Sequence, residues 1–208
     1  SNGYSLVEII GRGGTSGIGV FSFDFGGFIV DGGHSLKSKS SFLPSSASQA
    51  KPPQLLAHDD FPDDWEILLV ILDSKNTVNG QKEVNIFQDY CPVPKNEVEQ
   101  TSHIIFMNMI PFLLERDLPA FGHSIDEIQK RGFKNVEVSL QSQQIRDLMD
   151  KLREIGAYGV GMSSFGPTVY SVFDKNNKHI VEEIKEYVGD RGTVLTTKAQ
   201  NYGHEIQK

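Results

Sequence analysis

A glycine-rich run near the start of the chain constrains its fold more than any other feature. Residues 11–19 read Gly-Arg-Gly-Gly-Thr-Ser-Gly-Ile-Gly, and residues 26–34 read Gly-Gly-Phe-Ile-Val-Asp-Gly-Gly-His. Such segments have little side-chain bulk and present backbone N–H groups, which suits a loop that wraps a phosphate or diphosphate where a helix begins. A tight structural turn is the alternative. No Gly-Lys-Ser/Thr follows, so the run is not a P-loop, and its spacing is not a dinucleotide fingerprint.

The composition is that of a globular protein with enough residues to bury a core. The chain has 208 residues, of which 38% are hydrophobic and 23% charged. Its net charge is −7 and no dense basic stripe is present, which disfavours a general nucleic-acid binder. Cys91 is the single cysteine, so no intrachain disulfide can form, and no apolar run is long enough to span a membrane. We therefore expect a cytoplasmic protein. A homodimer is compatible with the sequence.

Hydrophobic periodicity predicts most of the secondary structure. Residues 20–30 predict a buried helix that gives way to a strand, and Pro111 predicts a kink in the helix that contains it. Gly132 and Gly156 are each expected to stop a helix. The predicted strands cover residues 66–72, 157–162, 168–173 and 193–198, the first of them buried, and the predicted helices cover residues 97–115, 118–132, 142–156 and 179–188. This order predicts an α+β chain in which helices cover one face of an antiparallel sheet, a ferredoxin-like layout.

Composition also suggests how the chain is divided. Residues 35–54 are rich in Ser, Pro, Ala and Lys. They read either as a mobile loop that closes over a ligand, with Ser45, Ser46 and Lys51 in it, or as a linker. A Pro-Asp-Asp sequence at 62–64 marks a boundary, which predicts domains at 1–64 and 65–208. The chain begins Ser-Asn and enters the glycine run almost at once, so we expect a fragment of a longer protein.

The glycine-rich segments resemble two motifs of the GHMP kinase superfamily. Residues 11–19 are similar to its second motif, and Gly-Val-Gly-Met-Ser-Ser-Phe-Gly-Pro-Thr at 159–168 is similar to its third. Within that superfamily, residues 11–19, 26–35, 42–48 and 61–65 resemble the archaeal beta-ribofuranosylaminobenzene 5'-phosphate synthases of methanopterin biosynthesis. The resemblance implies a GHMP-kinase-like fold, with a partial N-terminal domain and a ferredoxin-like C-terminal domain. The superfamily's first motif is missing from this sequence, which puts the activity of the fragment in doubt.

The reaction that this resemblance implies is the condensation of 5-phosphoribosyl 1-diphosphate with 4-aminobenzoate or 4-hydroxybenzoate. Carbon dioxide and diphosphate leave, with Mg²⁺ expected and no organic cofactor. The site must neutralise a diphosphate and stabilise an oxocarbenium-like ribosyl carbon, so electrostatic preorganisation is expected to supply much of the rate.

The resemblance assigns the phosphate groups to the first glycine run. Arg12 would pair with a phosphate oxygen through its planar guanidinium, although a surface arginine is the alternative. The Thr15 or Ser16 hydroxyl would assist. The backbone N–H groups that would cradle the phosphates belong to Gly13, Gly14, Thr15, Ser16 and Gly17.

The remaining candidate residues lie in the later glycine segments. Asp31 would hold the magnesium ion or stabilise positive charge at the ribosyl carbon, the alternative being a turn aspartate. His34 would donate to the leaving diphosphate or orient a carboxylate, the alternative being a structural histidine. Ser163, Ser164 and Gly166 would complete the pocket from the second domain, the alternative being a strand-connecting turn.

Two other classes of function stay open at this point. One is an ATP-dependent small-molecule kinase of the same superfamily, although the usual Gly-Leu-Gly-Ser-Ser core is replaced here by Gly-Thr-Ser-Gly-Ile. The other is a non-catalytic ferredoxin-like domain that senses a ligand or binds a partner and keeps the glycine loop as a relic.

Overall fold

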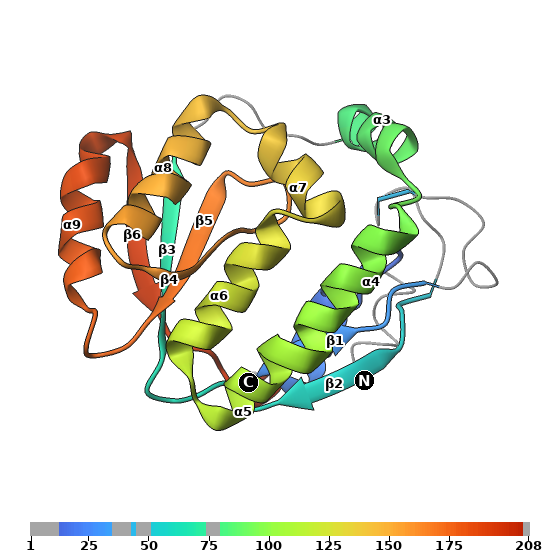
Figure 1. Ribbon diagram of the computed structural model, residues 1–208, viewed down its shortest axis with the longest axis horizontal. Coiled ribbons are helices and arrows are strands. Elements are labelled where there is room, and N and C mark those ends of the chain that lie inside the picture. Colours follow the sequence, from blue (N-terminus) through green and yellow to red (C-terminus); the bar gives the residue numbers. More distant parts are fainter. Residues whose placement is uncertain (1–12, 35–42, 45–50, 74–79, 206–208) are drawn as a thin grey trace. The chain divides into compact units, whose positions relative to one another are not determined.

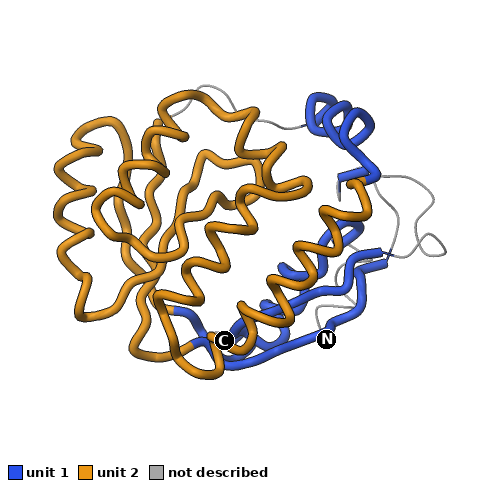
Figure 2. Tube along the Cα trace, viewed as in Figure 1, with its two compact units in different colours: residues 1–61, 79–92, 199–208 blue, residues 62–78, 93–198 orange. Residues whose placement is uncertain are grey.

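The computed structural model describes residues 13–34, 43–44, 51–73 and 80–205 (Figure 1). The chain forms two compact units (Figure 2): unit 1 comprises Ser1–Phe61, Asn79–Pro92 and Ala199–Lys208, and unit 2 comprises Pro62–Val78 and Val93–Lys198. The division at residues 64 and 65 inferred from the sequence stays a prediction. Arg12, Ser45 and Ser46 lie outside the described residues.

Unit 1 is built around a short antiparallel strand pair. Helix α2 (Ile18–Phe25) leads into β1 (Phe28–Asp31), which confirms the predicted change from helix to strand. The prediction that this helix is buried was wrong in part, because Phe23 and Phe25 are exposed. Strand β1 pairs with β2 (Leu55–Asp59), with Phe28 opposite Asp59. Neither β2 nor α3 (Gly80–Tyr90) was predicted. Strand β2 was missed because it has five residues and its partner strand lies far away in the sequence.

The C-terminal segment also belongs to unit 1. The side chain of Asn201 bonds both backbone groups of Phe61: Oδ1 accepts from the N–H at 2.8 Å, and Nδ2 donates to the C=O at 2.9 Å. The ring of His204 stacks on Phe23 with the ring centroids 4.0 Å apart. The last described residues are therefore tied to elements more than a hundred positions earlier, which no local pattern in the sequence could reveal.

Unit 2 contains a four-stranded antiparallel sheet with the order β4-β5-β3-β6. Strand β3 (Glu66–Leu72) pairs with both β5 (Thr168–Phe173) and β6 (Gly192–Thr197), and β4 (Tyr158–Met162) pairs with β5 at one edge. Strands β4 and β5 follow each other directly, and helices connect β3 to β4 and β5 to β6. This topology confirms the predicted ferredoxin-like sheet.

Helices α8 (Gln143–Glu154) and α9 (His179–Val188) cover one face of that sheet (Figure 1). Both carry apolar residues at helical spacing, and these side chains pack with alternate residues of β3, β4 and β5 to form the main core. The prediction that β3 is buried throughout was wrong: Leu68 and Val70 are fully buried, but Ile71 is 36% exposed. A strand presents successive residues to opposite faces, and the helices of the core cover only one of them.

The segment that follows α3 confirms one predicted helix, which contains a π-helical interruption. The expected helix over 97–115 forms as α4 (Lys95–Ile104), a π-helical turn η2 (Ile105–Met109) and α5 (Ile110–Glu115). The π turn lies directly before the helix that contains Pro111. The proline ring crowds the carbonyl of the preceding turn and the residue has no N–H to donate, which accounts for the interrupted α-helical hydrogen bonding there.

Gly132 does not stop α6, contrary to the prediction. Helix α6 (Leu118–Gln129) ends three residues before Gly132. Gly132, with φ of +53°, instead begins the next helix, α7 (Gly132–Ser139). Gly156 does end α8 as predicted, with φ of +86°. The short 3₁₀ turn η3 (Gly189–Arg191) follows α9. Of the helices that the structure describes, none has both the length and the apolarity needed to cross a bilayer.

One polar group in the core predicts a stabilising substitution. Ser171 is fully buried, and its hydroxyl has no hydrogen-bond partner among the described residues. We expect Ser171→Ala to raise the free energy of unfolding by about 1 kcal/mol, because an unsatisfied hydroxyl no longer has to be buried. Urea titration measures this change. Ser124→Ala is the matched control, since the buried Ser124 donates to Ala120 O at 3.0 Å and its loss should destabilise. Equal losses in both variants would contradict the prediction.

Candidate functional site

The first glycine run and Asp31 form one hydrogen-bonded group in unit 1. Asp31 ends β1, and its Oδ2 accepts from the backbone N–H of Gly17 at 2.8 Å and from the Ser16 hydroxyl at 3.1 Å. Its Oδ1 accepts from Gly33 N at 2.9 Å. Gly17 is the residue before the first turn of α2. The carboxylate therefore lies at the N-terminus of the helix, a position that favours an anion.

This arrangement engages part of the predicted phosphate cradle. The Gly17 N–H serves Asp31, and the Thr15 hydroxyl donates to Leu43 O at 2.5 Å. Gly13 has φ of +80°, and a Cβ there would lie 2.7 Å from Cγ of Pro52. That glycine is thus needed for the turn and for close packing. The proposed phosphate contacts of these residues stay predictions.

His34 is tied to the far end of the segment that the sequence suggested as a closing loop. Its Nε2 lies 2.7 Å from the backbone oxygen of Lys51. A carbonyl oxygen can only accept, so Nε2 carries the proton in this arrangement and Nδ1 is the nitrogen left for other partners.

The donor set for a magnesium ion is small. Within the part of the chain that the structure describes, no three His, Cys, Asp or Glu side chains come together as a metal-binding group. Magnesium usually keeps several waters and binds one or two carboxylates together with substrate phosphates. Asp31 together with diphosphate oxygens would fit such an ion, and its two carboxylate oxygens would then be shared between the ion and the loop.

The second candidate segment is the turn between β4 and β5 in unit 2. The Gly166 N–H donates to Ser163 O at 2.8 Å, and the Ser163 N–H donates to Thr168 O at 2.9 Å. Ser164 and Gly166 adopt left-handed conformations, with φ of +47° and +70°. The side chains of Ser163 and Ser164 are exposed, and neither hydroxyl bonds another described residue. Both are open to a ligand.

Side chains of α7 and of the segment just after it donate hydrogen bonds to this turn. None of these residues was identified as a candidate from the sequence. Lys134 Nζ donates to Met162 O at 3.2 Å and to Ser164 O at 3.3 Å, and it forms an ion pair with Glu137. Gln141, just beyond the helix, donates to Phe165 O at 2.6 Å. Burial raises the pKa of Glu137, and Lys134 offsets only part of that effect. No motif marks these residues, because their partners are backbone oxygens 24 to 30 positions away.

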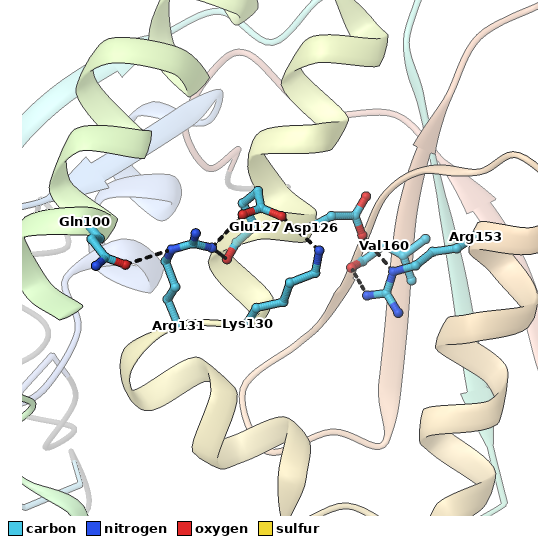
Figure 3. Close-up of polar contacts among 7 residues, drawn as sticks. All are labelled: Gln100, Asp126, Glu127, Lys130, Arg131, Arg153 and Val160. Atoms are coloured by element: carbon cyan, nitrogen blue, oxygen red, sulfur yellow. Dashed lines mark hydrogen bonds and ion pairs between the residues drawn. The ribbon is translucent and has the colours of Figure 1, made fainter.

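Side chains of α6 and α8 pair with the outer edge of β4 (Figure 3). Arg153 donates through Nε to Asp126 Oδ1 at 3.0 Å and through Nη2 to Val160 O at 3.4 Å. Gln129 Oε1 accepts from Met162 N at 3.1 Å. Burial raises the pKa of Asp126, although Arg153 opposes that shift. Two backbone groups of the strand that leads into the turn, Val160 O and Met162 N, thus pair with side chains.

The same figure shows an ion-pair cluster that predicts an acid-dependent loss of stability. Lys130 and Arg131 donate to the two carboxylate oxygens of Glu127 at 2.8 and 2.7 Å, and these hydrogen bonds lower the pKa of Glu127 to about 2 (Figure 3). A lowered folded-state pKa stabilises the fold above the ordinary value of 4.5, and this stabilisation disappears as the pH falls towards 2. We expect Glu127→Gln to cost about 1 kcal/mol at neutral pH, after allowance for solvent screening, and nothing at the acid end.

Denaturant titration between neutral pH and the acid limit tests this prediction. Glu99→Gln is the control, because Glu99 pairs with Lys95 on an exposed helix surface and should change little at any pH. A loss that is independent of pH in Glu127→Gln would show that the charge of Glu127 is not its source.

Comparison with known proteins gives close relatives over nearly the whole chain. The chain is 52% identical over 198 residues to the beta-ribofuranosylphenol 5'-phosphate synthase of Methanothermobacter thermautotrophicus, covering 95% of this chain and 60% of that protein. It is 48% identical over 212 residues to the protein of the same name from Methanocaldococcus jannaschii, covering 99% of this chain and 62% of that protein. The chain thus spans about three fifths of the length of these relatives.

Solved structures support the fold at much lower identity. A homoserine kinase from Cytophaga hutchinsonii matches with a TM-score of 0.61 at 16% identity, covering 88% of this chain and 52% of that one. A mevalonate diphosphate decarboxylase from Staphylococcus aureus matches with a TM-score of 0.58 at 16% identity, covering 100% of this chain and 61% of that one. Residues 109–192 match the model of the GHMP kinase C-terminal domain. The chain therefore carries a GHMP kinase C-terminal domain and is a homologue of the beta-ribofuranosylphenol 5'-phosphate synthases.

Proposed function

We propose that this chain is part of an enzyme that condenses 5-phosphoribosyl 1-diphosphate with a 4-substituted benzoate in tetrahydromethanopterin biosynthesis. The observation that carries the proposal is the 52% identity, over 95% of the chain, to a protein named as a beta-ribofuranosylphenol 5'-phosphate synthase. In the reaction, the bond from the ribosyl carbon to diphosphate breaks and a bond to the ring carbon forms. The carboxylate on that carbon leaves as carbon dioxide, and its electron pair restores the aromatic ring.

The acceptor that we favour is 4-hydroxybenzoate. The relatives' names describe a ribofuranosylphenol, a product that keeps a ring hydroxyl. Loss of the carboxylate from 4-hydroxybenzoate gives such a phenol, whereas 4-aminobenzoate would give an aminobenzene. The two acceptors remain distinguishable by direct assay.

The residues of unit 1 supply an anion site and a fixed carboxylate. The N-terminus of α2 and the glycine run would bind phosphate groups, and Asp31, oriented by three hydrogen bonds, would stabilise positive charge at the ribosyl carbon. His34, with Nε2 engaged by Lys51, would donate through Nδ1 to the leaving diphosphate when protonated. Alternatively, Asp31 and the diphosphate would together hold a magnesium ion, which would neutralise charge on the leaving group. In unit 2, the exposed Ser163 and Ser164 hydroxyls are proposed as phosphate donors.

Release of labelled carbon dioxide tests the proposal directly. The natural full-length protein is incubated with Mg²⁺, 5-phosphoribosyl 1-diphosphate and either carboxyl-labelled benzoate. We expect release that requires the diphosphate sugar and is faster with 4-hydroxybenzoate. A folded protein that releases no label from either acceptor would overturn the proposal. Consumption of ATP with small alcohols would then indicate a kinase. The cytoplasmic location and a homodimer stay predictions.

A further inference from the structure

The turn at residues 163–166 holds a backbone conformation that it would not keep unaided. Ser164 has φ of +47°, a left-handed conformation that residues with a Cβ rarely adopt. A residue in that region persists only where its surroundings over-determine it, and such residues cluster at ligand-binding sites. The two exposed serine hydroxyls at this turn bond no other described residue, so their directions depend on the backbone beneath them.

Lys134 and Gln141 supply what holds this conformation. Lys134 Nζ bridges the carbonyl oxygens on either side of Ser163, those of Met162 and Ser164, at 3.2 and 3.3 Å. Gln141 Nε2 donates to Phe165 O at 2.6 Å. Three backbone carbonyls of the turn, those of Met162, Ser164 and Phe165, therefore accept hydrogen bonds from side chains of α7 and of the segment just after it.

Apolar packing adds a further constraint at the same place. The buried ring of Phe165 meets the ring of Phe133, which precedes Lys134, edge to face with the centroids 6.0 Å apart. A Cβ at Gly166 would lie 3.0 Å from the sulfur of Met162 and 3.3 Å from Oε1 of Gln141. The turn thus lies directly against the side chains that orient it, with little room for it to shift.

Lys134 acts through position and not through free charge. An ammonium group has three protons, and Met162 O, Ser164 O and the Glu137 carboxylate accept all three. The carboxylate of Glu137 also neutralises the positive charge of Lys134. Both side chains are largely buried, since that of Lys134 is 23% exposed and that of Glu137 is 10% exposed. None of the three protons remains for a bound phosphate, so any effect of Lys134 on substrate must pass through the turn.

We propose that Lys134 and Gln141 are positioning residues that hold Ser163 and Ser164 in the geometry that binds 5-phosphoribosyl 1-diphosphate. This inference rests on the proposed function, because it takes that substrate from it. It assigns to α7 a role in substrate binding that the glycine-rich motifs themselves do not contain. Removal of either donor should free the turn and weaken binding, while the chemical step keeps its rate.

The test compares three variants with a charge-matched control in the natural full-length protein. Lys134→Met removes the two hydrogen bonds that Lys134 donates to the turn, and Lys134→Arg keeps the positive charge and N–H donors. Gln141→Leu removes one hydrogen bond to the turn with no change of charge. Lys130→Met is the control, because Lys130 carries the same charge, is 61% exposed and pairs with Glu127. Four quantities are measured: the rate of amide hydrogen exchange at Ser163 and Gly166, the calorimetric affinity for 5-phosphoribosyl 1-diphosphate, KM and kcat.

For Lys134→Met and Gln141→Leu we expect faster exchange at both amides and an affinity about tenfold weaker, the effect of losing a hydrogen bond to a charged or buried group. KM should rise by a similar factor with kcat nearly unchanged, Lys134→Arg should recover most of the loss, and Lys130→Met should resemble the unmodified protein. Unchanged exchange in both variants, or faster exchange with unchanged affinity, would overturn the inference. A loss in Lys130→Met equal to that in Lys134→Met would overturn it as well.

Calorimetry keeps this inference separate from the proposed reaction. A protein that binds the diphosphate sugar but releases no carbon dioxide would refute the synthase activity, while the exchange and affinity data would still decide whether α7 positions the turn. A protein that shows no affinity for the diphosphate sugar would overturn the inference, since the turn would then have no such substrate to bind.

Discussion

Replacement of Asp31 by alanine is expected to lower kcat/KM of the natural full-length protein by at least about 100-fold, the scale seen when a preorganised electrostatic group is removed. Asp31 is the acceptor for Gly17 N and for the Ser16 hydroxyl, and through Gly33 it also orders the turn that leads to His34. Its loss therefore removes a carboxylate from the proposed site and frees the glycine run at the same time. Release of labelled carbon dioxide at varied concentrations of the diphosphate sugar measures the effect.

Two further variants separate the charge of Asp31 from its hydrogen bonds. Asp31→Asn keeps the size of the side chain and one acceptor oxygen, so we expect its kcat/KM to lie between those of the unmodified protein and of Asp31→Ala. Asp60→Ala removes the same charge from an exposed position in unit 1 and should leave kcat/KM unchanged. If Asp31→Ala kept full activity with an unchanged melting temperature, the proposed role of the carboxylate would be refuted.

Gly122→Val should destabilise the protein by about 3 kcal/mol, at the upper end of the cost of overpacking. Helix α6 runs so close to β4 that a Cβ at Gly122 would lie 2.7 Å from the backbone nitrogen of Gly159 and 2.7 Å from Cβ of Tyr158. Backbone atoms of a paired strand cannot move aside as a flexible side chain can. Gly159 has φ of +61° at an irregularity in the pairing of β4 with β5, so a glycine lies on each side of this contact.

Denaturant unfolding of Gly122→Val beside His123→Val tests this close approach. His123 is the exposed neighbour of Gly122 on the same helix, so His123→Val reports the cost of a β-branched residue in α6 without a new contact. That cost should stay below about 0.5 kcal/mol. Equal destabilisation in the two variants would show that helix propensity, and not the contact with β4, is responsible.

Elements with their own apolar period were predictable from the sequence. Helices α8 and α9 and strands β3 and β5 were all expected close to their observed bounds. Each of these elements buries one face. Its apolar residues therefore recur about every 3.6 residues in a helix or every 2 in a strand, and this period can be read from the sequence. The glycine-rich segments were recognisable for a similar reason, because backbone at a tight turn or close contact restricts side-chain size at that position.

Elements whose position depends on distant partners were not predictable in this way. Strand β2 forms because β1 offers it a pairing edge, and α7 has only eight residues and a weak apolar period. The burial of β3 on one face and the ending of α6 before Gly132 were likewise decided by packing. A local pattern reports how a segment meets a surface, but it does not report which surface that is.

The same distinction between local pattern and distant contact applies to the candidate site. The sequence by itself identified the residues with suitable chemistry: the glycine runs, Asp31, His34 and the serines of the second turn. Only the tertiary structure showed that Asp31 lies at the N-terminus of α2 and that Lys134 holds the backbone around Ser163. The physical reason is that these hydrogen bonds join groups 14 to 30 positions apart, so the fold brings together partners that no motif or period in the sequence can pair.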